Sequence, residues 1–297
     1  MASVLTIGVF DGVHRGHQAL VAETVARAAT AQHRAIVVTF DPNPLEVLRP
    51  GHAPTRLCSV AHRVELLHAL GIDGVDVLRF DDAMSHMPAT EFVETVLVRR
   101  HDARQVVIGA GFRFGHKAAG TAQTLRDAGL KVVEFDLAAE GAEAISSTRV
   151  RARIAEGDVE LAASMLGRRH SLTGPVTHGQ KRGRTLGYPT ANLCVDSMAA
   201  IPADGVYAGY GYWPSGRALA AISVGTNPTF GVSQRTVEAY LLDVDQDLYG
   251  SEMTVEFAHR LRPMEKFEGV QALIEAMRVD VAKTRDLLGP GRPKPSL

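Results

Sequence analysis

Apolar positions follow two different rhythms along the chain, and the first of them fills residues 1–135. Short runs rich in β-branched residues alternate there with longer amphipathic stretches. The runs predict strands over Val4–Val9, Ala35–Phe40, Gly74–Phe80, Arg104–Gly109 and Lys131–Phe135, and the stretches predict helices over His17–Ala31, Val60–Leu70, Pro88–Arg100 and Thr121–Gly129. This alternation is typical of a parallel sheet covered by helices on both faces. Such a sheet binds ligands at the carboxyl ends of its strands.

The rhythm changes after about residue 145. Two short helices are predicted over Ser147–Glu156 and Val159–Leu166, and closely spaced strands follow without helices between them. These strands are predicted over Gly174–His178, Gly205–Tyr212, Ala218–Val224, Val237–Val244 and Met253–Leu261, and a last amphipathic helix over Phe267–Leu288. The pattern indicates a small closed or partly closed antiparallel barrel with a helix packed on it. We therefore expect domains over 1–166 and 167–288, and a disordered tail over 289–297.

Composition removes several classes of function. The 297 residues carry 32 Lys and Arg against 33 Asp and Glu, so no overall basic field exists to hold a nucleic acid. The two cysteines, Cys58 and Cys194, lie far apart, which argues against a disulfide framework. The N-terminus lacks the pattern of a secretory signal, and no apolar run approaches the ~20 residues of a membrane span. We expect a cytoplasmic protein with no nucleic acid or membrane partner; the pattern does not indicate its oligomeric state.

The segment between the first strand and the first helix carries the first candidate chemistry. It reads Phe10-Asp11-Gly12-Val13-His14-Arg15-Gly16-His17. Gly12 and Gly16 permit a tight turn, and free N–H groups at the start of the helix favour a phosphate. His14 and His17 can donate hydrogen bonds to that phosphate as its charge shifts. A turn with two surface histidines is an alternative of about equal weight, and a zinc site is a weaker one because no third ligand is evident.

Three later segments strengthen the phosphate interpretation. The segment 146–149 begins a helix, and its hydroxyls either cap that helix or, with Arg149, bind a pyrophosphate. The segments 39–44 and 109–115 follow strands and point toward the same edge of the sheet. Four loops at one edge of a parallel sheet favour a nucleotide site.

A glycine-rich stretch, 179–192, is the most informative part of the second half. Gly179, Gly183 and Gly187 recur at four-residue spacing with basic residues such as Lys181 between them, which suits a loop over phosphates. A solvated basic hairpin is the alternative for this loop alone. Thr190 and Asn192 lie two apart, so in an extended segment both side chains point to one face. Their oxygens are reasonable ligands for Mg²⁺ with nucleotide phosphates.

Glu238 interrupts an otherwise apolar strand, 236–242. An unpaired carboxylate in a dry core costs several kcal/mol, so a solvent-facing edge position is one interpretation. The other is a general base in a partly dry pocket, with its pKa raised toward the working pH.

The chain resembles a known family on these segments. Residues 4–166 resemble the adenylyltransferase module of bacterial bifunctional riboflavin kinase/FAD synthetases, because His14-Arg15-Gly16-His17 matches its H-x-G-H signature and 146–151 matches its S-S-T-x-x-R signature. Residues 170–288 resemble the riboflavin kinase module at 183–192, 224–230 and 247–250. The two resemblances cover nearly the whole chain in the family's order.

The resemblance implies a fold, substrates and roles. The fold is an α/β Rossmann-like nucleotidyltransferase domain followed by a six-stranded antiparallel β-barrel with a C-terminal helix. The substrates are riboflavin, FMN and ATP, with Mg²⁺ as cofactor, and the products are FMN and FAD. The implied catalytic residues are His14, His17, Arg149 and Glu238, with Thr190 and Asn192 at the metal. The implied ATP and phosphate contacts are Gly8, Phe10, Asp11, Gly16, Ser147, Thr148, Gly179, Lys181, Gly183, Gly187 and Thr190, and the implied flavin contacts are Asn43, Phe112, Arg113 and Phe114.

Three residues in the first half depart from the family's pattern. Val9, Asn43 and Gly111 stand where the family usually has Asn, His and Asp or Asn. Each departure removes a polar group near nucleotide or flavin. An alternative function is therefore an active kinase whose first module is weak or acts on another nucleotide or flavin-like substrate. A flavin-sensing protein with decayed sites is a third, which the joint presence of Thr190, Asn192 and Glu238 disfavours.

Overall fold

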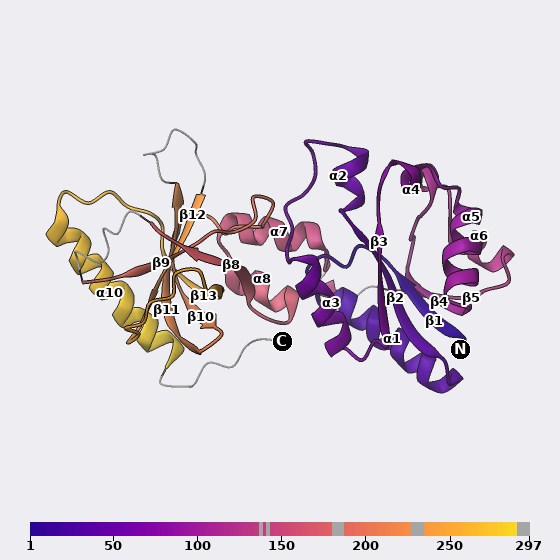
Figure 1. Ribbon diagram of the computed structural model, residues 1–297, viewed down its shortest axis with the longest axis horizontal. Coiled ribbons are helices and arrows are strands. Elements are labelled where there is room, and N and C mark those ends of the chain that lie inside the picture. The colour runs from indigo at the N-terminus through magenta and orange to yellow at the C-terminus, as the bar shows by residue number, and fades with distance from the viewer. Residues whose placement is uncertain (137–138, 141–142, 180–186, 227–234, 290–297) are drawn as a thin grey trace. The chain divides into compact units, whose positions relative to one another are not determined.

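The chain folds into two compact units, Met1–Ser147 and Thr148–Leu297, in the computed structural model (Figure 1). The structure describes residues 1–136, 139–140, 143–179, 187–226 and 235–289. Each unit has its own hydrophobic core, and each is described by itself below.

The first unit is built on a five-stranded parallel sheet in the order β3-β2-β1-β4-β5. Its strands are β1 Ser3–Ile7, β2 Arg34–Asp41, β3 Gly74–Arg79, β4 Ala103–Gly109 and β5 Lys131–Phe135. All four pairings are parallel. The parallel α/β arrangement predicted from the apolar runs is thereby confirmed, with β1 at the centre and buried along its whole length.

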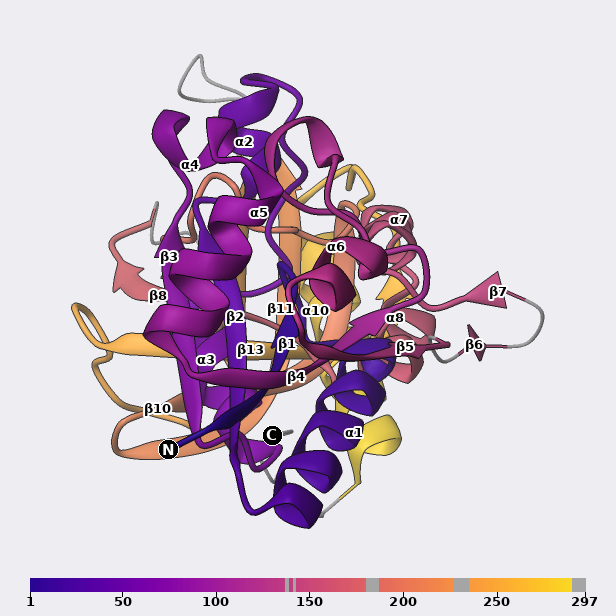
Figure 2. The same cartoon turned by 90° about the vertical axis from the view of Figure 1, so that its right-hand side faces the viewer.

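Helices cover both faces of this sheet. They are α1 Arg15–Ala31, α2 Pro44–Leu48, α3 Val60–Ala69, α4 Asp82–His86, α5 Ala89–Phe92, the π-helix η1 Val93–Arg100, the 3₁₀ turn η2 His116–Ala118 and α6 Ala122–Asp127. Apolar residues of α1 and α3 pack with Val4 and Val37 on one face, and those of η1 and α6 pack with Leu5 and Ile36 on the other. A short hairpin, β6 Ala139–Glu140 with β7 Glu143–Ala144, projects from the unit (Figure 2).

The second unit contains a closed antiparallel barrel of six strands in the order β10-β11-β12-β9-β8-β13. Its strands are β8 His170–Thr177, β9 Thr190–Leu193, β10 Gly205–Trp213, β11 Gly216–Thr226, β12 Arg235–Leu241 and β13 Glu252–Arg262. β13 pairs with β10 and closes the barrel. The predicted barrel is confirmed, and it is fully closed.

The described residues of this unit also form the helices α7 Ser147–Glu156, α8 Val159–Leu166 and α10 Val270–Leu288. The sequence pattern predicted the bounds of α7 and α8 as they are found. α10 packs against β10 and β11. Val159, at the start of α8, is fully buried in the barrel's core cluster. α8 is therefore part of the barrel's packing, whereas the sequence pattern grouped it with the first domain.

Candidate active sites

The first candidate site is the turn that joins β1 to α1, here called the phosphate turn and comprising residues 8–14. Its backbone is left-handed at Phe10 (φ 52°), Gly12 (φ 77°) and Val13 (φ 40°). Positive φ is strained for a phenylalanine and more so for a β-branched valine. Strained turns of this kind concentrate at functional sites, where the surrounding contacts hold them.

His14, the last residue of the phosphate turn, is stacked on His17 of α1. Their ring centroids lie 3.7 Å apart, and the ring planes differ by 15°. His14 is the N-cap of α1, and its Nδ1 accepts a hydrogen bond from the backbone N–H of His17 at 3.3 Å. Because this Nδ1 is an acceptor, the neutral ring of His14 carries its proton on Nε2. His14 is 2% exposed, so the alternative of two surface histidines is wrong for it.

His17 lies under the turn with one ring nitrogen unused. Its Nδ1 is buried and has no hydrogen-bond partner among the described residues. Burial, followed by the nearby His14 and Arg63, lowers the pKa of His17 well below its usual value. The ring is therefore neutral near pH 7 and able to donate one N–H to an anion. Within the described residues, no three His, Cys, Asp or Glu side chains are grouped to hold a metal, so the zinc interpretation has no support there.

Asp11 organises the loop beside the turn. Its carboxylate accepts hydrogen bonds from the backbone N–H groups of Leu57 (3.0 Å) and Cys58 (3.4 Å). Its backbone carbonyl accepts a hydrogen bond from Ser147 Oγ at 2.9 Å, which joins the start of α7 to the turn. This gives Asp11 a structural part; its contact with ATP stays a prediction.

The other phosphate residues occupy tight or exposed positions. A Cβ on Gly8 would lie 3.2 Å from the Phe10 ring, and one on Gly16 would lie 3.2 Å from the His14 ring, so a side chain at either position would need the neighbouring ring to shift by a few tenths of an ångström. Thr148 is exposed and Arg149 is half-buried on α7, in the second unit. Their approach to a nucleotide stays a prediction.

The predicted flavin residues have unequal surroundings. Asn43 is the N-cap of α2, and its side chain accepts from the N–H of Leu45 at 3.0 Å. Phe114 is buried in the core against Phe92, with ring centroids 5.9 Å apart. Phe112 is half-buried and stacked on Phe114, while Arg113 is exposed. The structure thus gives Phe114 a packing role, and the flavin contacts stay predictions.

Sequence reasoning missed Arg63, a buried residue of α3. Its Nη1 donates to the carbonyl of Val9, which leads into the phosphate turn, at 2.5 Å. The signal was present in the helical period, because Arg63 shares a face with Leu66 and Leu67, which are both buried. A cation on the apolar face of a helix is unusual enough to mark a position for scrutiny.

The second candidate site lies on the outer face of the barrel, where β9 and β12 pair. Asn192 is directly opposite Glu238, and Thr190 is opposite Tyr240, so Thr190 and Asn192 share a face as their spacing predicted. Thr190 Oγ1 donates to Glu238 Oε2 at 3.1 Å. Glu238 is half-buried on a strand paired on both sides, so the interpretation of an edge position is wrong.

The glycine-rich loop is described only at its two ends. A Cβ on Gly179 would lie 2.3 Å from the Asn192 side chain, so this glycine lets the chain approach the Asn192 amide. Gly187 has a positive φ of 83° and open space around it. Lys181 and Gly183 lie outside the described residues.

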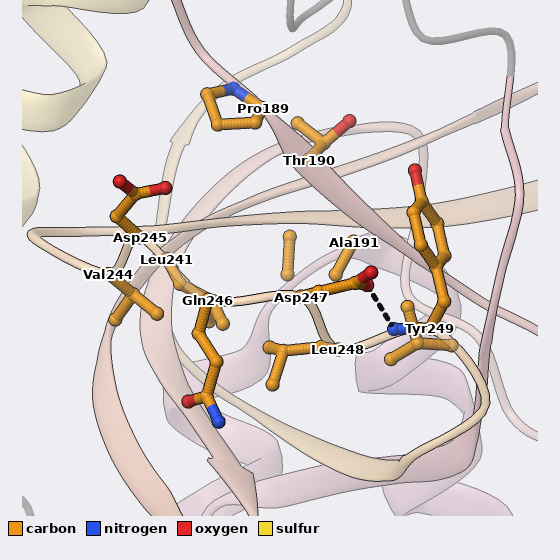
Figure 3. Close-up of a pocket in the computed structure, with 12 residues that line it drawn as sticks. Pro189, Thr190, Ala191, Leu241, Val244, Asp245, Gln246, Asp247, Leu248 and Tyr249 are labelled. Atoms are coloured by element: carbon orange, nitrogen blue, oxygen red, sulfur yellow. Dashed lines mark hydrogen bonds between the residues drawn. The ribbon is translucent and has the colours of Figure 1, made fainter.

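Thr190 lines two cavities. The larger, of about 470 Å³, lies between β9 and the loop 244–249 (Figure 3). In that view Pro189 and Thr190 lie at the top, Asp245 lies at the left, and Gln246 and Leu248 lie lower. Tyr249 also lines it, with its ring centroid 3.9 Å from that of His178, and is positioned by a hydrogen bond from its N–H to Asp247 (3.0 Å).

The smaller cavity, of about 270 Å³, lies between the barrel and α10. Its lining is largely aromatic and apolar and includes Glu238: Tyr188, Thr190, Val206, Ala221, Ser223, Glu238, Tyr240, Arg262, Met264, Glu265, Phe267, Leu273, Met277, Asp280 and Val281. The rings of Tyr188 and Tyr240 meet edge to face at 5.2 Å, and burial raises the pKa of the Tyr240 hydroxyl. This cavity is suited to a flat aromatic ligand with Glu238 at its margin.

Comparison with known proteins agrees with both halves of the chain. A family model described as FAD synthetase matches residues 1–149, and one described as riboflavin kinase matches residues 166–288. Relatives named bifunctional riboflavin kinase/FMN adenylyltransferase include those of Escherichia coli K12 (34% identical, covering 98% of this chain and 94% of the relative) and Pseudomonas fluorescens (37%, covering 97% and 93%). A relative of the same name in Listeria monocytogenes is 36% identical over 95% of this chain and 91% of its own.

A solved structure shares the whole fold. It comes from Streptococcus pneumoniae and is described as a macrolide-efflux protein; it superposes with a TM-score of 0.89 at 32% identity, covering 96% of this chain and 94% of its own. Among the residues described in the present structure, no helix is long and apolar enough to cross a membrane.

Proposed function

The chain belongs to the family of bifunctional riboflavin kinases/FMN adenylyltransferases, and from this premise we propose how its two units divide the work. It makes FMN from riboflavin and FAD from FMN, consuming ATP in each step. In our proposal the barrel unit carries out the phosphorylation, and the unit with the parallel sheet carries out the adenylylation.

The observation that carries the kinase assignment is that Thr190, which is hydrogen-bonded to Glu238, lines both cavities. ATP occupies the larger cavity, where the ring of Tyr249 offers a surface for the base. Riboflavin occupies the smaller one, against the rings of Tyr188 and Tyr240. The 5′-hydroxyl then attacks the γ-phosphorus, the bond to the ADP oxygen breaks, and Glu238 takes the hydroxyl proton.

The residues around Thr190 fit Mg²⁺. The Thr190 hydroxyl, the Asn192 amide and the Glu238 carboxylate provide hard oxygen ligands on one face of the paired strands. Gly179 has no side chain to collide with the Asn192 amide beside it. When bound with ATP, Mg²⁺ supplies positive charge that offsets the charge developing on the phosphates. Thr190 and Asn192 would hold it, and Glu238 remains the group that accepts the proton.

The adenylylation needs positioning more than acid–base chemistry. A phosphate oxygen of FMN, largely ionised near neutral pH, attacks the α-phosphorus of ATP, and the bond to pyrophosphate breaks. The N-terminus of α1, the Nε2–H of His14 and the neutral ring of His17 donate to the phosphates in this proposal, with Arg149 holding the pyrophosphate. Phe112, Arg113 and Asn43 serve the flavin.

Two features support the organisation and setting we propose. The matched segments, 1–149 and 166–288, support two functional modules, which we place at 1–166 and 167–288; α8 is the last helix of the first module in sequence and packs in the barrel core. Neither Cys58 nor Cys194 forms a disulfide within the described residues, and the co-substrate is ATP, which supports work in the cytoplasm.

The test is to incubate the protein with riboflavin, ATP and Mg²⁺ and to separate FMN from FAD. Thr190→Val should lower FMN formation by roughly 10-fold or more, because one oxygen donor leaves the shared wall of the cavities. Thr173→Val is the matched control, since Thr173 is a threonine on the neighbouring strand β8 that shares a hydrogen bond with Thr254 and is not among the residues that line the two cavities. Equal rates for the two variants would contradict the assignment of the barrel site. If His14→Ala forms FAD as fast as the natural protein, the assignment of the adenylylation site is contradicted.

A further inference from the structure

Arg63 is a buried cation with no anionic partner. It is 6% exposed, and among the described residues no carboxylate lies within 4.0 Å of its guanidinium. Its Nε is buried and has no hydrogen-bond partner in the described part of the chain. A buried, unpaired charge costs several kcal/mol, so a folded protein keeps one where something outside the fold compensates it.

The guanidinium lies at the carboxyl ends of two strands. Its Nη1 donates to the carbonyl of Val9 at 2.5 Å, to Thr39 Oγ1 at 3.2 Å and to the carbonyl of Phe40 at 3.2 Å. Thr39 Oγ1 in turn donates to the same carbonyl of Val9 at 2.9 Å. Arg63 therefore joins the end of β2 to the first residues of the phosphate turn, next to the left-handed Phe10.

The first unit holds further buried polar atoms without a partner in the described part of the chain. Besides Arg63 Nε, the buried side-chain atoms without a partner in the described residues are His17 Nδ1 and Thr6 Oγ1. All three belong to the first unit, and Thr6 is on β1, which leads into the phosphate turn. The positive charge of Arg63 also reaches His17, because it is one of the causes that lower the pKa of that histidine.

Asp11 does not neutralise Arg63. Its carboxylate is buried in the same turn but accepts from the N–H groups of Leu57 and Cys58, and it makes no ion pair with Arg63 within 4.0 Å. The charge of Arg63 therefore adds to the positive end of the α1 dipole at this edge of the sheet.

We propose that Arg63 is a positioning residue for adenylyl transfer, which holds the phosphate turn through the carbonyl of Val9 and provides, from beneath it, positive charge that the triphosphate of ATP compensates. The proposal rests on the adenylyltransferase function proposed above. Arg63 acts through the turn and through His17, and it requires no direct contact with the reacting atoms. ATP binding should then relieve an unfavourable charge in the free protein as well as form new contacts.

The geometry predicts which substitutions are tolerated. One nitrogen of Arg63 contacts three acceptors, and an ammonium has three N–H donors where Nη1 has two. Arg63→Lys therefore keeps the positive charge and can keep the three hydrogen bonds, and it removes the Nε that has no partner among the described residues. Arg63→Met keeps the apolar volume and removes both charge and anchor. Arg99→Met is the matched control, because Arg99 is an exposed arginine of the same unit, paired with Glu94.

The experiment measures FAD formation from FMN and ATP, with riboflavin phosphorylation by the same samples as a reference for the other unit. Arg63→Met should lower kcat/KM for FAD formation by roughly 30-fold or more, largely through a higher KM for ATP, and leave FMN formation unchanged. Arg63→Lys should stay within about 3-fold of the natural protein, and Arg99→Met should be indistinguishable from it.

A binding measurement separates this proposal from the function on which it rests. Calorimetry with inorganic pyrophosphate and with ATP should show affinities reduced by roughly 10-fold or more in Arg63→Met and restored in Arg63→Lys. If the natural protein makes no FAD, the proposed adenylylation fails, and this binding series still decides the role of Arg63. Equal affinities in Arg63→Met and the natural protein, or an Arg63→Lys variant as impaired as Arg63→Met, would overturn the proposal.

Discussion

Removing the negative charge of Asp280 should weaken the attachment of α10 to the barrel and lower the stability of the second unit. The only fully buried side chains of α10 are Asp280 and Thr284, and both are polar. Asp280 accepts three hydrogen bonds from Arg262 of β13, at 2.8 to 3.2 Å, with side-chain exposures of 5% and 16%. Breaking a buried pair leaves an uncompensated charge, at about 3–5 kcal/mol. Because Arg262 is partly exposed and also stacks on Phe267, we expect about 3 kcal/mol for Asp280→Asn.

Urea unfolding of the full chain measures this change. The single tryptophan, Trp213, lies on β10, so its fluorescence reports the unit that contains α10. Glu275→Gln is the matched control, because Glu275 forms an exposed pair with Arg278 on the same helix and should leave the midpoint unchanged. Replacing both partners, with Arg262→Met and Asp280→Leu, should recover most of the stability. An Asp280→Asn protein as stable as the control would refute the view that this ion pair holds the helix.

Three further predictions concern the barrel unit. Glu238→Gln should keep the fold and lower riboflavin phosphorylation by ~10²-fold or more, which single-turnover FMN formation measures; unchanged turnover would remove Glu238 from the mechanism. Burial lowers the pKa of His170 to about 4, so below pH 6.5 the unfolded chain takes up a proton that the folded chain does not. Urea unfolding should therefore show a loss of about 3 kcal/mol in the free energy of unfolding as the pH falls from 6.5 toward 4. A His170→Gln protein with the same pH dependence would contradict this. A fragment over 148–297 should unfold cooperatively and phosphorylate riboflavin. A fragment over 168–297 should have a lower melting temperature, because it lacks Val159 of α8, which is buried in the barrel core. Equal melting temperatures would contradict this packing role of α8.

Apolar periodicity was sufficient to predict both architectures, because the order of apolar and polar residues within a single strand already shows which of its faces are buried. β2 is a run of consecutive apolar residues since both its faces are covered. β12 alternates between the barrel core and the outer face, and so Glu238 and Tyr240 point outward together. The phosphate turn was also visible, because its glycines and histidines are adjacent in sequence.

Features that depend on distant segments were not visible. The role of Arg63 arises only when α3 places it against β1 and β2, 54 residues from Val9 along the chain. The pairing of Asn192 with Glu238 requires the closure of the barrel. The short helix α2 was missed because five residues carry too little periodicity. The core position of Phe114 could not be separated from a ligand contact, because an aromatic residue suits both.

The two departures from the family at Asn43 and Gly111 have a local explanation that the sequence pattern concealed. Asn43 forms a capping box with Glu46, and asparagine is among the best N-cap residues, worth about 1 kcal/mol over a poor one. Gly111 has a φ of 73° with nothing within 4 Å of where a Cβ would lie, so a side chain there has space but strains the backbone by about 1 kcal/mol. Asn43→His with Gly111→Asp should therefore destabilise the first unit by about 2 kcal/mol. The same double variant should raise FAD formation, measured well below its melting temperature, by roughly 10-fold if the lost polar groups limit catalysis. If the folded double variant forms FAD no faster than the natural protein, then Asn43 and Gly111 do not limit catalysis. The alternative of a weak first module would then lose its basis.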